Sequence, residues 1–170
     1  LFKTFGQVDS FPICLDTQDT EEIIKTCKLL APGLGGINLE DISAPRCVEI
    51  ERRLIEELDI PVFHDDQHGT AIITIAALVN ACKLTGKDSK SLKVVISGAG
   101  AAGSSIANMI NQYGVKDILC LDSKGILSSK RENLDFVKKE ILAFSNKDDV
   151  DGDLKFAMKN ADVFVGVSIA

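Results

Sequence analysis

The stretch LKVVISGAGAAGSSIANMINQYGVKDILCLD, residues Leu92–Asp122, decides the fold of this chain. Its β-branched residues over 93–97 predict a strand, and the spacing of apolar residues over 101–113 predicts a helix. Gly114 ends that helix, and the apolar run 117–122 predicts the next strand. The order strand, helix, strand is typical of a βαβ unit with parallel strands.

A glycine-rich turn, GAGAAG at residues 98–103, joins the first strand to the helix and fits the pattern GxGxxG. The pattern alone is weak, but here a strand precedes it, a helix follows it, and an acid ends the next strand about 20 residues later. Such glycines let a pyrophosphate approach free N–H groups at the helix N-terminus. We therefore expect half a Rossmann domain that binds NAD or NADP; the alternative is a similar turn that binds no nucleotide. The expected cofactor contacts are Gly98, Gly100, Ala101, Ala102 and Gly103.

Asp122 ends the second strand of the unit, where an acidic residue accepts hydrogen bonds from the adenosine ribose hydroxyls. A carboxylate at this place favours NAD, because it would repel the 2′-phosphate of NADP. Ser123 and Lys124 follow it directly and weaken that preference. The predicted cofactor is NAD or NADP, with a slight preference for NAD.

Strands and helices alternate through the rest of the chain as well, which predicts an α/β fold with a largely parallel sheet. The helix expected from Gly69 to about Leu84 is apolar on nearly every side, so we expect it to be buried between two lobes. The expected organisation is a smaller α/β lobe over 1–69, a buried connecting helix and loop over 70–91, and a partial Rossmann domain over 92–170. Further strands are expected over 11–15, 36–39, 60–63 and 162–168, and further helices over 20–30, 45–58, 128–145 and 154–160.

Two acidic pairs, Glu40-Asp41 and Asp65-Asp66, each follow an expected strand. Strand ends of a parallel sheet share one edge, where ligands bind, so the four carboxylates are expected to gather there. Their mutual repulsion calls for a cation, and an all-oxygen set suits Mg²⁺ or Mn²⁺. The alternative is that each pair caps a helix or lies in a solvated turn, and spacing alone favours neither.

Composition narrows the class of protein. With 45% hydrophobic residues and a net charge of −6, the chain can form a core but has no basic excess for nucleic acid. No apolar run approaches the roughly 20 residues that span a bilayer, so we expect no membrane partner. Five scattered cysteines predict reduced, buried thiols and a cytoplasmic location, with an organellar matrix as the alternative. The chain starts without Met, and we expect it to be part of a longer one.

Several motifs resemble the malic enzymes, in the shorter, bacterial-type branch of that family, and the resemblance covers essentially the whole chain. The most specific is FHDDQHGTA at 63–71, followed by a long aliphatic helix. The glycine turn matches too. The other matching segments are GGINLEDI at 35–42, APRC at 44–47 and FVGVS at 164–168.

This resemblance implies that the smaller lobe over 1–69 is the part of the enzyme that serves metal and substrate, and it implies residue roles. Glu40, Asp41 and Asp66 would be the ligands of a divalent metal, Mg²⁺ or Mn²⁺, and Asp65 would support the lysine that acts as general base. The turn over 100–103 would hold the cofactor, with Val167 and Ser168 close to it on the third strand.

The implied reaction is oxidative decarboxylation of L-malate to pyruvate and CO₂ with reduction of NAD or NADP. The lysine takes the hydroxyl proton as hydride leaves C2, the metal acts as a Lewis acid, and a tyrosine protonates enolpyruvate. Two other interpretations stay open: a malolactic-type decarboxylase that releases lactate, and a non-catalytic NAD-binding module. By analogy alone, the partners are malate or pyruvate and further copies of the chain, in a dimer or tetramer.

The sequence also departs from a complete enzyme. Tyr113, its only tyrosine, fits the packing face of a helix and not the place of a proton donor. The base lysine is expected before Leu1 and the malate-binding asparagines after Ala170, so Lys3 is interpreted as a surface residue. His64 and His68 are interpreted as structural. These 170 residues alone are expected to show no malate-dependent reduction of NAD(P).

Overall fold

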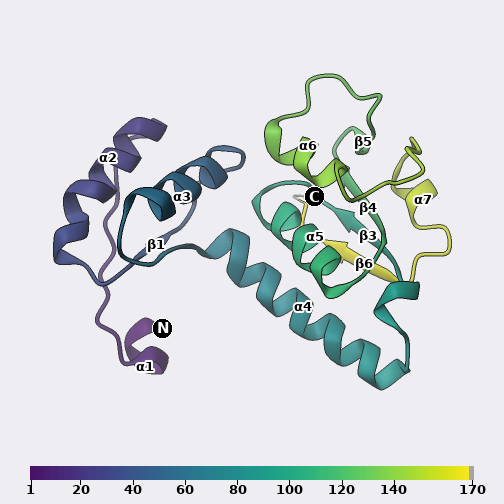
Figure 1. Ribbon diagram of the computed structural model, residues 1–170, viewed down its shortest axis with the longest axis horizontal. Coiled ribbons are helices and arrows are strands. Elements are labelled where there is room, and N and C mark those ends of the chain that lie inside the picture. The colour runs from purple at the N-terminus through teal and green to yellow at the C-terminus, as the bar shows by residue number, and fades with distance from the viewer. Residues whose placement is uncertain (169–170) are drawn as a thin grey trace.

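The chain forms two lobes joined by one long helix, α4 (Figure 1). A computed structural model describes residues 1–168. The N-terminal lobe carries two short strands, and the C-terminal lobe is built on a larger sheet. The elements in chain order are α1 Phe2–Gly6, α2 Thr20–Leu30, η1 Ala31–Gly33, β1 Ile37–Leu39, α3 Arg46–Glu57, β2 Val62–His64, α4 Asp65–Thr85, η2 Ser89–Ser91, β3 Lys93–Ser97, α5 Ala101–Tyr113, β4 Asp117–Asp122, β5 Gly125–Ile126, α6 Phe136–Leu142, α7 Leu154–Ala157 and β6 Val163–Gly166.

The sheet of the C-terminal lobe has the strand order β5-β4-β3-β6, in which β4, β3 and β6 are parallel and β5 is antiparallel. Val95 of the central strand β3 lies opposite Leu119 of β4 and Phe164 of β6. Residues 94–96 of β3 are fully buried, because the strand has neighbours on both edges and apolar side chains on both faces. The predicted βαβ unit is confirmed, with its helix α5 packed against α4.

The N-terminal lobe is smaller. Its strands β1 and β2 are parallel, with Leu39 opposite His64. Helices α2 and α3 pack together there, and Ile50 and Leu54 of α3 are fully buried in its core. The lobe thus presents the ends of two parallel strands at one edge, and this edge is where the acidic pairs lie.

Besides α4, three predicted elements are wrong in extent or kind. Residues 11–15 form no strand; their side chains are exposed, and no strand in residues 1–168 lies beside them to complete a sheet. Within 128–145 only α6 is helical, because Asn133 has a left-handed φ of 60° and Asp135 caps the helix that begins after it. Helix α7 ends at Ala157, short of the predicted 160, and Asn160 has a φ of 58°.

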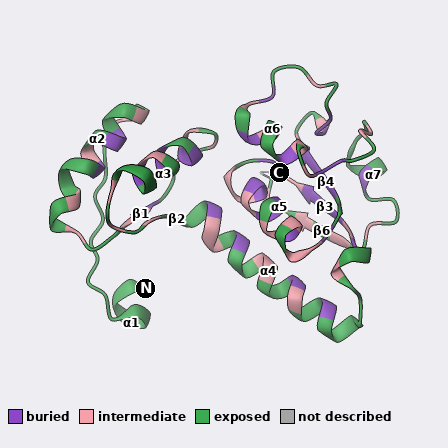
Figure 2. Cartoon of the chain, viewed as in Figure 1, coloured by how far each residue is buried: buried purple, intermediate pink, exposed green. Residues whose placement is uncertain are grey.

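Helix α4 differs most from expectation. It begins at Asp65, four residues before Gly69, because His64 caps its first turn. It is also mostly exposed (Figure 2): Ile73 is 72% and Leu84 89% accessible, and burial is confined to the side that faces α5 and, at the first turn, α3. The predicted burial is wrong for this chain, since an apolar helix is buried only where a partner covers it. By length and composition α4 also meets the criterion for a membrane span, which core helices of globular proteins meet as well.

Candidate functional site

The acidic pairs do lie at one edge, as predicted. Glu40-Asp41 leave β1 and Asp65-Asp66 leave β2 at the same level, because the parallel register sets Leu39 opposite His64. The Asp41 N–H donates to Oδ2 of Asp66 at 3.2 Å, which joins the two segments directly. The second pair lies in the first turn of α4 and not in a turn before it.

The four carboxylates share the edge but do not converge. Oε1 of Glu40 accepts from the Asn38 amide at 2.6 Å, and Asp41 has a φ of 57°. In residues 1–168, no three His, Cys, Asp or Glu side chains lie close enough to hold a metal ion. The residues fit Mg²⁺ or Mn²⁺ in donor type, since all four are exposed oxygen donors on adjoining segments. The ligand set Glu40, Asp41 and Asp66 stays a prediction.

Asp65 lies against Gly69, one turn further along α4. A Cβ atom at residue 69 would come within 2.3 Å of Oδ1 of Asp65, so only glycine leaves room for this carboxylate. Both residues line an open hollow of about 410 Å³, together with Thr70, Ile73 and Thr74. The glycine in the motif at 63–71 therefore has a geometric reason.

A buried polar cluster supports this first turn from inside the lobe. Its centre is Glu51 of α3, which is 4% exposed and accepts hydrogen bonds from His64, Gln67 and His68. His64 is fully buried, and the structural role expected for it stays a prediction. Sequence reasoning missed Glu51, although it lies four residues after Cys47 and three before Leu54, and so falls on the apolar face of its helix.

The glycine turn of the C-terminal lobe is as tight as its sequence predicts. Gly98 has a φ of 113°, and a Cβ there would lie 2.7 Å from the Val167 backbone. A Cβ at Gly103 would lie 1.6 Å from the Gly98 carbonyl oxygen. Ser97 Oγ lies 3.4 Å from Ser168 Oγ, which places the end of β6 beside the turn. Gly100, Ala101 and Ala102 lie at the start of α5, where the first N–H groups of a helix are free to bind an anion.

Asp122 is engaged by its own neighbours. Arg131 donates to both of its carboxylate oxygens at 2.9 and 2.8 Å, and the Lys124 N–H donates to Oδ1 at 2.9 Å. Lys138 donates to Oδ2 at 3.1 Å. Burial alone would raise the pKa of Asp122, but these hydrogen bonds outweigh it and lower the pKa to about 2. The sequence interpretation missed both Arg131 and Lys138, and the predicted contact of Asp122 with ribose stays a prediction.

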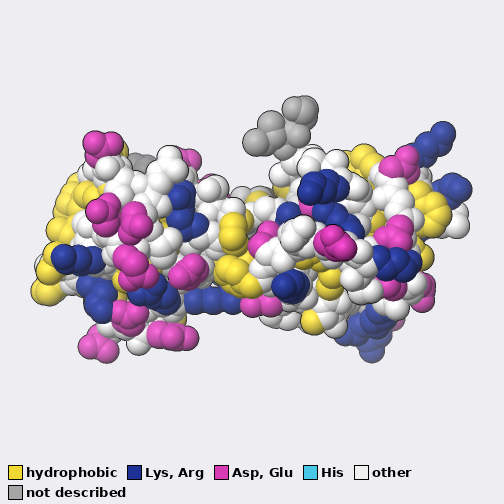
Figure 3. All heavy atoms as spheres, turned by 90° about the horizontal axis from the view of Figure 1, so that it is seen from above, with side chains coloured by type: hydrophobic (Ala, Val, Ile, Leu, Met, Phe, Trp, Pro, Cys, Tyr) yellow, Lys and Arg dark blue, Asp and Glu magenta, His cyan; other side chains and the backbone are white. Residues whose placement is uncertain are grey.

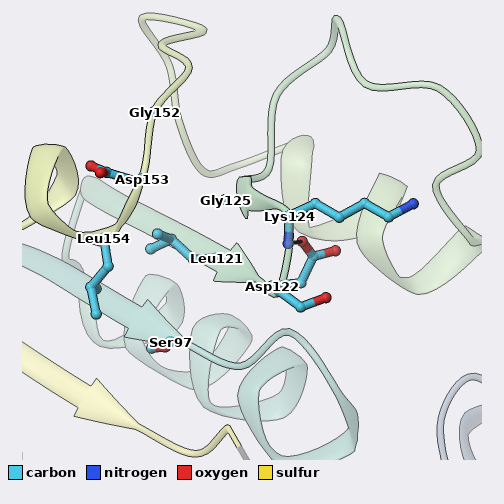
Figure 4. Close-up of a pocket in the computed structure, with 9 residues that line it drawn as sticks. Ser97, Leu121, Asp122, Lys124, Gly125, Gly152, Asp153 and Leu154 are labelled. Carbon is cyan, nitrogen blue, oxygen red and sulfur yellow. Dashed lines mark hydrogen bonds between the residues drawn. The ribbon is translucent and has the colours of Figure 1, made fainter. Parts of the chain in front are cut away.

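A second hollow, of about 360 Å³, opens beside Asp122 at the carboxyl ends of β3 and β4 (Figure 4). Leu121 and Leu154 give it an apolar wall, and Ser97 and Asp153 lie at its margin. A hollow of mixed polar and apolar lining next to the glycine turn suits the adenosine end of a dinucleotide.

Other predicted assignments can be placed as well. Lys3 is a surface residue paired with Asp9 at 2.6 Å, and Tyr113 packs against the core of the C-terminal lobe. All five cysteines are free; Cys14 is exposed, contrary to expectation, and the other four are buried. Figure 3 shows acidic and basic side chains interspersed over both lobes.

Comparison with known proteins gives concordant matches. The family described as "Malic enzyme, NAD binding domain" matches residues 67–168. A bifunctional malic/malolactic enzyme of Bacillus subtilis is 56% identical over 100% of this chain and 42% of its own length. An NADP-dependent malic enzyme of Rhizobium meliloti is 46% identical over 99% of this chain and 22% of its own length.

Among solved structures, the NAD-dependent malic enzyme of Thermotoga maritima superimposes with a TM-score of 0.95 at 47% identity. That match covers 99% of this chain and 45% of the solved one. The chain therefore spans less than half the length of each of these relatives.

Proposed function

The chain belongs to the malic enzyme family, and from this premise we propose that the intact protein converts L-malate to pyruvate and CO₂ while reducing NAD or NADP. The observation that carries the proposal is the juxtaposition in one chain of two sites. One is the acidic edge formed by β1, β2 and the start of α4, and the other is the glycine turn before α5. A non-catalytic NAD-binding module would have no use for the first of these.

Each site has a distinct task in this reaction. The free N–H groups at the start of α5 bind the pyrophosphate, and the hollow beside Asp122 takes the adenosine end. The carboxylate of Asp65, held against Gly69, orients the lysine that removes the malate hydroxyl proton. We place that lysine, the tyrosine that protonates C3 and the malate-binding asparagines in parts of the protein outside these 170 residues.

We assign the divalent cation to Glu40, Asp41 and Asp66. When bound, Mg²⁺ or Mn²⁺ supplies Lewis acidity that polarises the C2 carbonyl and stabilises the enolate left by CO₂. The exposed acids at the edge neutralise the ion, and the Asp41 N–H holds the Asp66 carboxylate toward the other strand end.

Replacing Asp66 with alanine tests this assignment. In the intact protein, we expect the Kd for Mn²⁺, measured by electron paramagnetic resonance, to rise by at least about 10-fold, since a direct ligand matters no less than its supporting shell. Asp59→Ala is the matched control, because it removes an exposed acid from the same lobe. Unchanged Mn²⁺ affinity in Asp66→Ala would remove the ligand assignment.

We further propose that the adenosine corner accepts NADP as well as NAD. Two cations, Arg131 and Lys138, surround the single carboxylate of Asp122, so its repulsion of a 2′-phosphate is more than balanced. The sequence predicted only a slight preference for NAD, from Asp122 with Ser123 and Lys124 beside it, and these two further cations argue against that preference.

Lys138→Ala is therefore expected to weaken NADP more than NAD. One lost charge-assisted contact to phosphate is worth about 1.5 to 3 kcal/mol, which corresponds to a rise in the Kd for NADP of about 10-fold or more. The neighbouring exposed Lys139→Ala serves as the control. Isothermal titration with both cofactors measures the effect, and equal weakening of NAD and NADP would contradict it.

A malolactic activity is the second candidate, favoured by the bifunctional Bacillus subtilis relative. Both reactions use the same two sites, so the products distinguish them. Pyruvate with stoichiometric NADH indicates the malic reaction, and lactate without net NADH indicates the malolactic one. We propose the malic reaction as the principal activity, carried out by a homo-oligomer in the cytoplasm.

A further inference from the structure

Glu51 is a carboxylate buried directly behind the acidic edge. It belongs to α3, its side chain is 5% exposed, and three hydrogen bonds converge on it. The donors are the backbone N–H of His64 at 2.9 Å, Nε2 of Gln67 at 3.2 Å and Nε2 of His68 at 2.9 Å. These residues lie immediately before and after the pair Asp65-Asp66.

The fold alone gives little reason for this residue. Glu51 lies on the buried face of α3 beside Cys47 and Leu54, which are fully buried. Burying a carboxylate is unfavourable unless it is fully paired, and an apolar side chain of similar volume often stabilises such a site equally well. Among the ion pairs of residues 1–168, Glu51 has only the imidazole of His68 and neither Lys nor Arg.

The contacts of Glu51 instead fix the geometry of one short segment. The hydrogen bond from the His64 N–H to Glu51 fixes the end of β2. Nδ1 of the same His64 accepts a hydrogen bond from the Gln67 N–H at 3.2 Å and so caps α4. The hydrogen bonds from the side chains of Gln67 and His68 to Glu51 anchor the inner side of the first turn of α4. Asp65 and Asp66 are left exposed at the edge, with Asp66 tied to the Asp41 N–H.

We propose that Glu51 is a positioning residue for the metal and base-supporting acids. One buried carboxylate clamps the chain on both sides of Asp65-Asp66, so that these two side chains leave a rigid turn in a fixed direction. The inference rests on the proposed function, because it takes the acidic edge to be the cation site.

The isosteric variant Glu51→Gln in the intact protein tests the proposal. Its amide has one oxygen acceptor in place of two, and its NH₂ group would face the donors Gln67 and His68. Outer-shell partners of metal ligands are worth about 10- to 100-fold in affinity, so the Kd for Mn²⁺ is expected to rise about 10-fold or more. Glu56→Gln, an exposed acid on the same helix, is expected to leave that Kd unchanged.

Two further measurements separate positioning from a purely structural role. The Kd for NAD or NADP without metal is expected to stay near wild type, because the glycine turn lies in the other lobe. The unfolding temperature reports any general loss of stability. Gln67→Met removes one donor of the clamp while keeping the carboxylate, and is expected to weaken Mn²⁺ binding by a smaller factor. Wild-type Mn²⁺ affinity in Glu51→Gln overturns the proposal, as does parallel loss of cofactor binding and thermal stability.

Asp66→Ala, measured in the same series, identifies which proposal has failed. If Asp66→Ala weakens Mn²⁺ binding and Glu51→Gln does not, the cation site stands and the positioning role is overturned. If Asp66→Ala also binds Mn²⁺ as wild type does, the ligand assignment and the positioning role are both overturned.

Discussion

Gly103→Ala is expected to abolish binding of NAD and NADP and to destabilise the C-terminal lobe. The added Cβ would lie 1.6 Å from the carbonyl oxygen of Gly98 and 2.8 Å from its carbonyl carbon. Both are backbone atoms of the turn, so the start of α5 must move away from β3. Overpacking of this kind typically costs about 1 to 3 kcal/mol, and a backbone clash belongs at the upper end or above.

Thermal unfolding and isothermal titration of the intact protein measure the two effects. Gly100→Ala is the matched control for stability, because a Cβ at that position meets nothing within 4 Å. We expect Gly100→Ala to unfold at the wild-type temperature. A Gly103→Ala protein with wild-type stability and cofactor affinity would show that the turn accommodates a Cβ at residue 103, contrary to the close contact with the Gly98 carbonyl.

The C-terminal unit was predictable because its signals are local. The predicted strand 93–97, helix 101–113 and strand 117–122 coincide with β3, α5 and β4. Each is bounded by a glycine or by a change of apolar spacing that is visible within a few residues. Gly98 has a φ of 113°, a backbone conformation that glycine adopts readily and other residues rarely do, so this position is also predictable from the local sequence.

Patterns that depend on distant partners were less informative. The apolar spacing over 128–145 reports burial in general, and some buried residues of that segment, such as Leu134 and Ser145, lie outside α6. The aliphatic composition of α4 predicted burial, but composition does not say what covers a helix. In residues 1–168 only one side of α4 is covered, mainly by α5 and at its first turn by α3.

The candidate site likewise divides into residues that local sequence signals predict and residues that are brought in by distant parts of the chain. The acidic edge followed from the rule that parallel strand ends meet, and it required only the order of the elements. Glu51 contacts residues 13, 16 and 17 positions away, and Arg131 and Lys138 reach Asp122 from 9 and 16 positions away. Such pairings arise from tertiary packing, which a single sequence does not encode in its spacing.

Gly69→Ala is expected to separate activity from stability. Alanine in a helix interior is favoured over glycine by about 0.5 to 1 kcal/mol, so α4 should be no less stable. The new methyl group would lie 2.3 Å from Oδ1 of Asp65, and this carboxylate is the flexible partner that must turn away. Displacing a catalytic support by about 1 Å can lower the rate about 10²-fold, so we expect a loss of that order in kcat.

Steady-state kinetics of the intact protein with Asp65→Ala and the double variant complete the test. If Gly69→Ala acts only by displacing the Asp65 carboxylate, Asp65→Ala should lose at least as much kcat, and the double variant should lose no more than Asp65→Ala alone. The Kd for NAD or NADP should be unchanged in all three, because the glycine turn before α5 is untouched. Additive losses in kcat would mean that Gly69 serves the site through a contact other than the one with Asp65. A wild-type kcat in Gly69→Ala would mean that catalysis does not depend on the position that the Asp65 carboxylate occupies beside residue 69.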